Sequence, residues 1–162
     1  MTTTTMTIPK IEISQFQKRH SADFARLNYA WLKKYFSIEE HDKEQLENPY
    51  DYIVKPGGEI LTALDGESVV GTVALVKVDD DIFEVAKMAV AETHQGLKIG
   101  YRLMLAAIDY SIKVGKKKLI LESNTKLPPA LNLYIKVGFR VIAQDPNTLY
   151  SRSNIRMELK LQ

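Results

Sequence analysis

Three strand-like segments in a row, followed by a glycine-bearing turn, place the strongest limit on how this chain can fold. The first two segments, Glu59 to Leu64 and Ser68 to Val78, flank Asp65-Gly66, a pair typical of a tight β-hairpin. A second turn leads into a third strand segment, Ile82 to Val90. Strands joined by short turns run antiparallel, so we expect an antiparallel sheet that leads directly into the turn from Gln95 to Tyr101.

The other segments predict helices for both faces of this sheet. Ser21 is predicted to cap a helix whose apolar residues recur at helical spacing, and a capping box of Ser37 and Glu40 opens a second helix that stops before Asn48-Pro49. The remaining predicted helices are 99–114, closed by Gly115, and 130–137, preceded by Pro128-Pro129 and closed by Gly138. Further strands are predicted at 10–13, 119–121, 139–143 and 155–161.

These elements follow one another in the order β-α-α-β-β-β-α-β-α-β-β. This order predicts an α+β protein with a mixed, mostly antiparallel sheet and helices on both faces. We expect residues 1–7, which are rich in threonine, to be a disordered tail, and residues 8–162 to form one domain.

Composition excludes several classes of function. The 162 residues include no cysteine, which removes thiol nucleophiles, thiolate metal sites and disulfides. The histidines, His20, His41 and His94, are too scattered to suggest metal-ligand spacing. A net charge of +2 gives no reason to expect a nucleic-acid partner, and no segment is apolar enough for a signal peptide or a membrane span. We therefore expect a soluble cytoplasmic protein without a metal site.

The glycine-bearing turn before the predicted helix at 99–114 is a candidate anion site. The first amides of a helix have no partner within it, and they point together along the positive end of the helix dipole. The dinucleotide-binding pattern requires three glycines after a parallel strand, but only Gly96 and Gly100 are present here. The P-loop requires Gly-Lys-Ser or Gly-Lys-Thr, whereas Gly100 precedes Tyr101-Arg102. Neither familiar phosphate motif fits.

Residues 85–139 instead resemble the GNAT superfamily of acetyl-coenzyme A-dependent N-acetyltransferases. Residues 84–90 resemble the strand that precedes the pyrophosphate loop of that family. Residues 119–124 resemble its next strand, and residues 130–139 resemble its Asn-x-Tyr helix that ends in Gly-Phe. The order of strands and helices also matches, so the resemblance extends over nearly the whole chain. Taken alone the loop is weak evidence, but the four features in this order are specific.

The pyrophosphate loop of the family reads Gln or Arg, two residues, Gly, one residue, then Gly or Ala. Gln95 and Gly100 match its ends, whereas Lys98 replaces the inner glycine. Glycine at that place lets the backbone approach the pyrophosphate and adopt an unusual φ, and lysine carries a Cβ that opposes this. The lysine side chain adds positive charge, and we interpret the site as retained.

The resemblance implies that acetyl-CoA lies where the fourth and fifth strands splay apart, with its pantetheine arm along the backbone of the fourth strand. It also implies direct attack of an amine on the thioester in a ternary complex. Tyr134 matches the tyrosine that protonates the leaving thiolate. Glu84 is the candidate base, with Glu122 or a water molecule as alternatives. The cofactor-binding residues implied are Met88, Ala89, Val90, Gln95, Gly96, Leu97, Lys98, Ile99, Gly100, Tyr101, Asn124 and Asn132.

Other interpretations stay open from the residues alone. Tyr134 is compatible with a packed aromatic, and Glu84 with a surface carboxylate or a partner of Lys87. We interpret the acids Glu39, Glu40 and Asp42 as ordinary first-turn helix acids. The resemblance implies a small-molecule or peptide amine as acceptor and is compatible with a homodimer. A non-catalytic module that binds acetyl-CoA and a protein interaction domain are the alternative functions.

Overall fold

The computed structural model describes residues 10–148 and 151–161, so the predicted tail at 1–7 lies outside the described residues. These residues form a seven-stranded sheet in the order β1-β2-β3-β4-β5-β7-β6. The strands are β1 (Ile11–Gln15), β2 (Glu59–Asp65), β3 (Ser68–Lys77), β4 (Ile82–Val90), β5 (Lys118–Ser123), β6 (Arg140–Ile142) and β7 (Ile155–Lys160). The helices are α1 (Ser21–Tyr35), α2 (Glu40–Glu47), α3 (Ile99–Lys113) and α4 (Pro128–Lys136).

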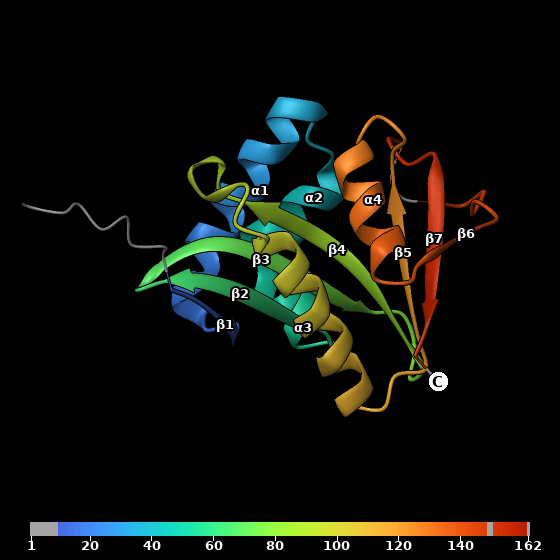
Figure 1. Cartoon of the computed structure of the whole chain (residues 1–162), viewed down its shortest axis with the longest axis horizontal. Helices are drawn as coiled ribbons and strands as arrows, with labels where there is room; N and C mark the ends of the chain where they lie inside the picture. Colours follow the sequence, from blue (N-terminus) through green and yellow to red (C-terminus); the bar gives the residue numbers. More distant parts are fainter. Residues whose placement is uncertain (1–9, 149–150, 162) are drawn as a thin grey trace, which may run out of the picture.

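Every strand pair in the sheet is antiparallel except β4 with β5, which run parallel. The parallel pair arises because α3 carries the chain from the end of β4 back to the start of β5. Only the first residues of the two strands pair, from Ile82 with Lys118 to Glu84 with Ile120. Figure 1 shows β4 and β5 together at their starts and spreading apart toward their ends. The predicted α+β class and the splayed fourth and fifth strands are confirmed.

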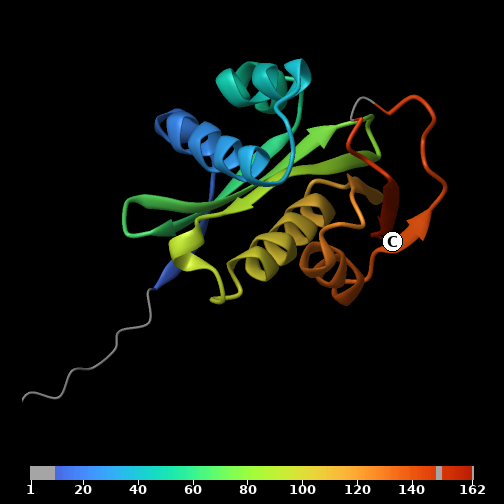
Figure 2. The same ribbon diagram turned by 90° about the horizontal axis from the view of Figure 1, so that it is seen from above.

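Helices cover both faces of the sheet, as predicted, with α1 and α2 on one face and α3 and α4 on the other (Figure 2). A core lies on each side. Phe24 and Leu32 of α1 and Leu46 of α2 pack against one face, and Leu103 and Met104 of α3 pack against the other. A sheet buried on both faces explains why β3 is a nearly continuous apolar segment instead of an alternating one.

The starts of the first two helices differ from the prediction. Ser21 is the first residue of α1, and its hydroxyl donates to the carbonyl of Lys18 instead of capping the helix. The predicted capping box of Ser37 and Glu40 is wrong by two residues, because Glu39 is the N-cap of α2 and Asp42 is its N3 residue. The side chains of Glu39 and Asp42 each accept from the backbone of the other. The predicted end before Asn48-Pro49 is correct.

A single turn of π-helix lies between α2 and β2, at Tyr50–Val54. It was not predicted from the sequence. Its local pattern carries no helical periodicity, and Ile53 is held there by packing in the core beneath α1. None of the helices within 10–148 and 151–161 is long and apolar enough to cross a membrane.

Candidate active site

A cleft of about 320 Å³ opens where β4 and β5 part. From Val85 to Val90, the edge of β4 that faces β5 has no strand partner within the described residues. The walls of the cleft come from α1, β4, β5, α4, the turn before α3, and residues 152–153. Unpaired backbone groups along one wall can accept an extended ligand as if it were an added strand. Met88, Ala89 and Val90, predicted to bind the cofactor, all line this wall.

A β-bulge interrupts β4 at this wall. Thr72 and Ala74 of β3 pair with Ala89 and Ala86, so Lys87 and Met88 together lie opposite a single residue of β3. Lys87 has φ +52°, which is unusual for a residue other than glycine.

The buried side chains of Thr72 and Asn28 hold the bulge in place. The hydroxyl of Thr72 donates to the carbonyl of Lys87 at 3.2 Å. The amide of Asn28 in α1 donates to that hydroxyl at 3.2 Å and to the carbonyl of Phe24 at 2.9 Å. Asn28 and Thr72 are buried, so these bonds form in a medium of low polarity and fix the backbone of β4 in the cleft. This role of Asn28 and Thr72 was not predicted from the sequence, because it depends on the register between strands.

The glycine-bearing turn has the geometry of an anion site. Gly96 and Lys98 have φ of +84° and +60°, and Lys98 is the N-cap of α3. Within the described residues, the amides from Gly96 to Tyr101 donate no hydrogen bond, and the first bond of the helix runs from Arg102 to Lys98 at 3.0 Å. Lysine therefore adopts the left-handed conformation in which glycine is ordinarily found. The predicted residues Gln95, Gly96, Lys98, Ile99 and Gly100 line a shallow hollow at this turn.

The residues of this turn differ in which part faces the hollow. The side chain of Ile99 is buried in the core, so Ile99 would meet a ligand in the hollow through its amide, whereas Leu97 is exposed and does not line the hollow. A Cβ on Gly100 would come within 3.6 Å of Leu133 and 4.0 Å of Met88, both of which line the cleft. These are ordinary van der Waals distances, so an alanine would also fit at position 100 where the hollow meets the cleft.

Glu84 lines the cleft from β4, at the last residue that pairs with β5. Burial, together with the negative charge of Glu122, raises the pKa of Glu84 to about 7, whereas the charges of Lys87 and Arg156 act to lower it. A carboxylate with a pKa near neutrality is well suited to take a proton from an amine. The structure therefore places the predicted base in a setting that suits the role.

Glu122 lies on the neighbouring strand and also lines the cleft. Its Oε2 accepts from the hydroxyl of Thr148 at 2.7 Å, while its buried Oε1 has no partner among the described residues. Arg156 lies directly opposite Glu122 on β7, and its buried Nε is likewise without a partner in the described part of the chain. Glu122, which lines the cleft, and Arg156 opposite it therefore retain hydrogen-bonding capacity that no described residue uses.

Tyr134 enters the cleft from α4, and its ring packs against Phe139 at 6.0 Å between centroids. Burial raises the pKa of Tyr134 to about 12, so the hydroxyl keeps its proton at neutral pH. Tyr134 and Glu84, the two predicted catalytic residues, thus line the same cleft.

The two predicted asparagines have different positions. Asn124 lines the cleft, but its amide donates to the carbonyl of Arg152 at 2.7 Å and its oxygen accepts from the amide of Lys126 at 2.8 Å. Asn132 is exposed on α4 and does not line the cleft. Tyr101 is half-buried, with the ammonium of Lys136 at 4.6 Å from its ring centroid. Contact of these side chains with a cofactor stays a prediction.

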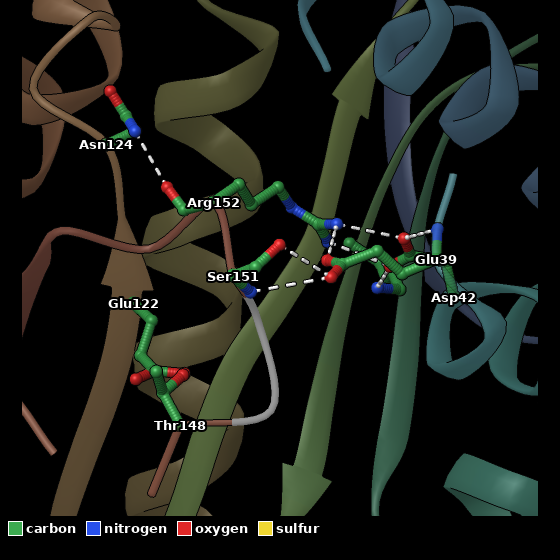
Figure 3. Close-up of polar contacts among 8 residues, drawn as sticks. Glu39, Asp42, Glu122, Asn124, Thr148, Ser151 and Arg152 are labelled. Carbon is green, nitrogen blue, oxygen red and sulfur yellow. Dashed lines mark hydrogen bonds and ion pairs between the residues drawn. The ribbon is translucent and has the colours of Figure 1, made fainter. Parts of the chain in front are cut away.

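An ionic cluster of Glu39, Asp42, Lys87 and Arg152 joins the start of α2 to β4 and to the segment before β7, and its members Lys87 and Arg152 line the cleft. Figure 3 shows the contacts of Arg152 with Glu39 and Asp42. Arg152 donates to both carboxylate oxygens of Asp42 at 2.8 and 2.9 Å and to Glu39 at 2.7 Å. The ammonium of Lys87 donates to Asp42 at 2.7 Å. The side chains of Asp42 and Lys87 are 0% and 5% exposed, respectively. Ser151 adds a bond from its hydroxyl to Glu39 at 2.9 Å.

These contacts favour the charged forms of Asp42 and Lys87 in the ionic cluster. Burial alone would raise the pKa of Asp42, but the bonds from Arg152 and Lys87 outweigh it and hold the pKa well below its ordinary value. Burial lowers the pKa of Lys87, and the pairing with Asp42 opposes that decrease. Asp42 is a first-turn helix acid, as predicted, but its ion pairs were missed because Lys87 and Arg152 are distant from it in sequence.

Comparison with known proteins shows the family to which this chain belongs. The sequence profile of the acetyltransferase (GNAT) family matches residues 25–139. The chain belongs to the GNAT family. This is a family of acyltransferase enzymes, as the resemblance in the sequence had indicated. An uncharacterized N-acetyltransferase of Bacillus subtilis, YvbK, is 33% identical over 88 residues, which are 54% of this chain and 57% of YvbK. The match spans little more than half the length of that relative.

Solved structures of GNAT proteins share the architecture. An acetyltransferase of the GNAT family from Staphylococcus aureus superposes with a TM-score of 0.85 at 22% identity, covering 94% of this chain and 100% of that one. A Bacillus subtilis acetyltransferase, solved in complex with CoA, superposes with a TM-score of 0.71 at 22% identity and the same coverage. These likenesses confirm the GNAT fold that was predicted from the sequence.

Proposed function

We propose that this GNAT protein transfers the acetyl group of acetyl-CoA to a primary amine by direct attack in a ternary complex. The observation that carries the proposal is the placement of Glu84 and Tyr134 in one cleft with the unpaired edge of β4. The acceptor in this proposal is a small-molecule or peptide amine. A cytoplasmic location and a homodimer stay predictions.

The residues of the cleft fit acetyl-CoA as co-substrate. The free amides from Gly96 to Tyr101 suit a pyrophosphate, and Lys98 brings positive charge to the same turn. The edge of β4 beyond Glu84 suits the amide groups of pantetheine. The Bacillus subtilis acetyltransferase of the same fold was solved with CoA bound, which supports this choice of ligand.

The proposed reaction proceeds without a covalent enzyme intermediate, in keeping with the absence of cysteine. The amine nitrogen attacks the thioester carbon, and Glu84 accepts its proton directly or through water. A backbone amide near the bulge of β4 donates to the oxyanion, an interaction that is typically worth about 3 kcal/mol. As the carbon–sulfur bond breaks, Tyr134 donates its proton to the sulfur. Glu84 then releases the proton of the amine to solvent, and Tyr134 regains a proton from solvent. The products are the acetylated amine and the free thiol of CoA.

The test is thiol release from acetyl-CoA with a panel of amines. Removing the hydroxyl in Tyr134→Phe should lower turnover by roughly a hundredfold, which is the lower end for loss of a proton donor. Acetyl-CoA affinity, measured by calorimetry, should stay within the range of the parent. Tyr110→Phe is the matched control, because Tyr110 is a partly buried tyrosine that stacks on Phe83 and does not line the cleft.

Glu84→Gln should abolish the rise in turnover with pH that we expect near pH 7 in the parent protein. Equal turnover in Tyr134→Phe and the parent would remove the proposed role of that residue. Acetyl-CoA binding without thiol release for any amine in a broad panel would contradict acetyl transfer and favour a non-catalytic module.

A further inference from the structure

The charges around Glu84 come from several elements. Glu84, Lys87 and Glu122 line one cleft, and Lys87 lies three residues beyond Glu84 on β4. Glu122 of β5 opposes the ionisation of Glu84, while Lys87 and Arg156 of β7 favour it. Lys87 belongs to the ionic cluster. The other members are Glu39 and Asp42 from the start of α2 and Arg152 from the segment before β7. Arg156 is shared with Asp145, whose carboxylate is 3.6 Å from its guanidinium.

Lys87 is held more firmly than Arg156, the other cation near Glu84. Its ammonium is fixed by Asp42 at 2.7 Å, and its carbonyl is fixed by Thr72 at 3.2 Å. Its backbone forms the bulge with φ +52°, so the side chain leaves β4 in a direction that regular strand geometry would not give. Asp42 is in turn fixed by the guanidinium of Arg152 and by the backbone amide of Glu39. The position of the ammonium is therefore set by three separate parts of the chain.

We propose that Lys87, held by Asp42, is a positioning residue that keeps Glu84 in the ionised form needed to accept the proton of the amine. The inference rests on the proposed function of Glu84 as the base. The ionic cluster also joins α2 and residues 151–152 to the bulge of β4, so the walls on either side of the cleft are fixed relative to the base. Loss of the Lys87 ammonium removes a positive charge that favours ionised Glu84, while the negative charge of Glu122 remains. Glu84 therefore binds its proton more tightly.

The first experiment needs no acceptor. The carboxyl of Glu84 is titrated by NMR on protein with isotope-labelled glutamate side chains, and its signal is assigned by its loss in Glu84→Gln. Lys87→Met retains most of the buried stem and removes the charge, and Asp42 keeps its two bonds from Arg152. The midpoint of the Glu84 titration should rise by roughly half a pH unit or more relative to the parent, as expected for loss of one nearby charge at a partly buried site.

Two further variants separate charge from structure. Lys43→Met removes an exposed lysine of α2 that pairs with Glu40 at 3.8 Å, and it should leave the midpoint unchanged. Lys87→Arg keeps the charge and should restore a midpoint close to that of the parent. If Lys87→Met does not fold, Lys87→Gln serves in its place, because its amide can still donate to Asp42.

The same variants are then compared in turnover with an amine that gives thiol release. The acid limb of the pH profile should move to higher pH in Lys87→Met, while turnover on the plateau above it changes less. A midpoint that stays in place in Lys87→Met and Lys87→Gln would overturn the role of Lys87. A parent protein without an acid limb, or a Glu84→Gln variant that retains it, would contradict the role of Glu84 as the base. That outcome is distinct from a failure of the role of Lys87.

Discussion

Lys98 shows how one residue can depart from the pattern of its family without loss of the local geometry. It occupies the left-handed region at φ +60° and ψ +26°, where a side chain ordinarily costs about 1–2 kcal/mol. The side chain is exposed, so no packing in the described structure compensates for this conformation. The conformation is retained because the chain must turn sharply from β4 into α3 at this point. What lysine offers in return is a positive charge beside the free amides of the turn.

Lys98→Gly should therefore raise the free energy of unfolding by up to about 1 kcal/mol, because relief of the left-handed strain exceeds the added chain entropy of glycine. Urea unfolding measures this change. Lys43→Gly, at an exposed position inside α2, is the matched control and should lower the free energy by about 1 kcal/mol. Acetyl-CoA affinity in Lys98→Gly should fall at low salt and approach that of the parent at high salt. A loss of stability equal to that of the control would contradict the account of strain.

At the scale of residues, the sequence predicted those whose identity is part of a motif. Tyr134 and Glu84 were found because they belong to segments that resemble a family, and the structure places both in the cleft. Asp42, Lys87 and Arg152 could not be found in this way. Their relation depends on three segments that meet only in the folded chain, and a lysine or aspartate in isolation gives no sign of its partner.

Among the elements, β4 is the one whose irregularity matters most for the site. The buried hydroxyl of Thr72 supports its bulge, and Thr72→Val removes that hydroxyl with little change in shape. The carbonyl of Lys87 then loses a donor, so the free energy of unfolding should fall by about 1–2 kcal/mol. Acetyl-CoA affinity should fall as well, because the bulge lies in the wall predicted to bind pantetheine.

Thr62→Val is the matched control for this change. Thr62 is also buried in the sheet, directly opposite Thr72, but its hydroxyl bonds with Ser14 of β1 instead of with β4. Urea unfolding should give a similar loss of stability for both variants, while calorimetry should show weaker acetyl-CoA binding only for Thr72→Val. Equal affinities in the two variants would mean that the bulge does not help to form the binding wall.

The regular part of each element could be predicted, and its irregular part could not. Alternation, the Asp-Gly hairpin and the closing glycines placed the strands and helices close to their observed limits. The bulge at Lys87 escaped prediction because it is defined by a register against β3 that the sequence of β4 does not specify. The cap of α2 was misplaced because Ser37 with Glu40 and Glu39 with Asp42 both satisfy the spacing of a capping box, and tertiary contacts decide between them.

At the scale of the whole molecule, the carboxyl of Glu84 lowers the free energy of unfolding at the pH where the proposed base is needed. The pKa of Glu84 is about 7 in the folded chain against 4.5 as its ordinary value. Between these values the folded state binds more protons than the unfolded state, so the free energy of unfolding falls as pH rises through this range. Above pH 7 the loss is complete, at about 3 kcal/mol. The proposed base acts only when ionised, so activity requires the pH range in which this loss is present.

Glu84→Gln removes this dependence, and the difference in free energy of unfolding between variant and parent should grow by about 3 kcal/mol from pH 4.5 to pH 8. The difference is the proper quantity because burial lowers the pKa of His20 and His41, which gives both proteins a slope of opposite sign below pH 6.5. Urea unfolding at a series of pH values measures it. Curves that stay parallel would show that Glu84 titrates normally in the folded chain. If Glu84→Gln is more stable than the parent above pH 7 and has lower turnover there, the carboxyl of Glu84 both lowers stability and supports catalysis.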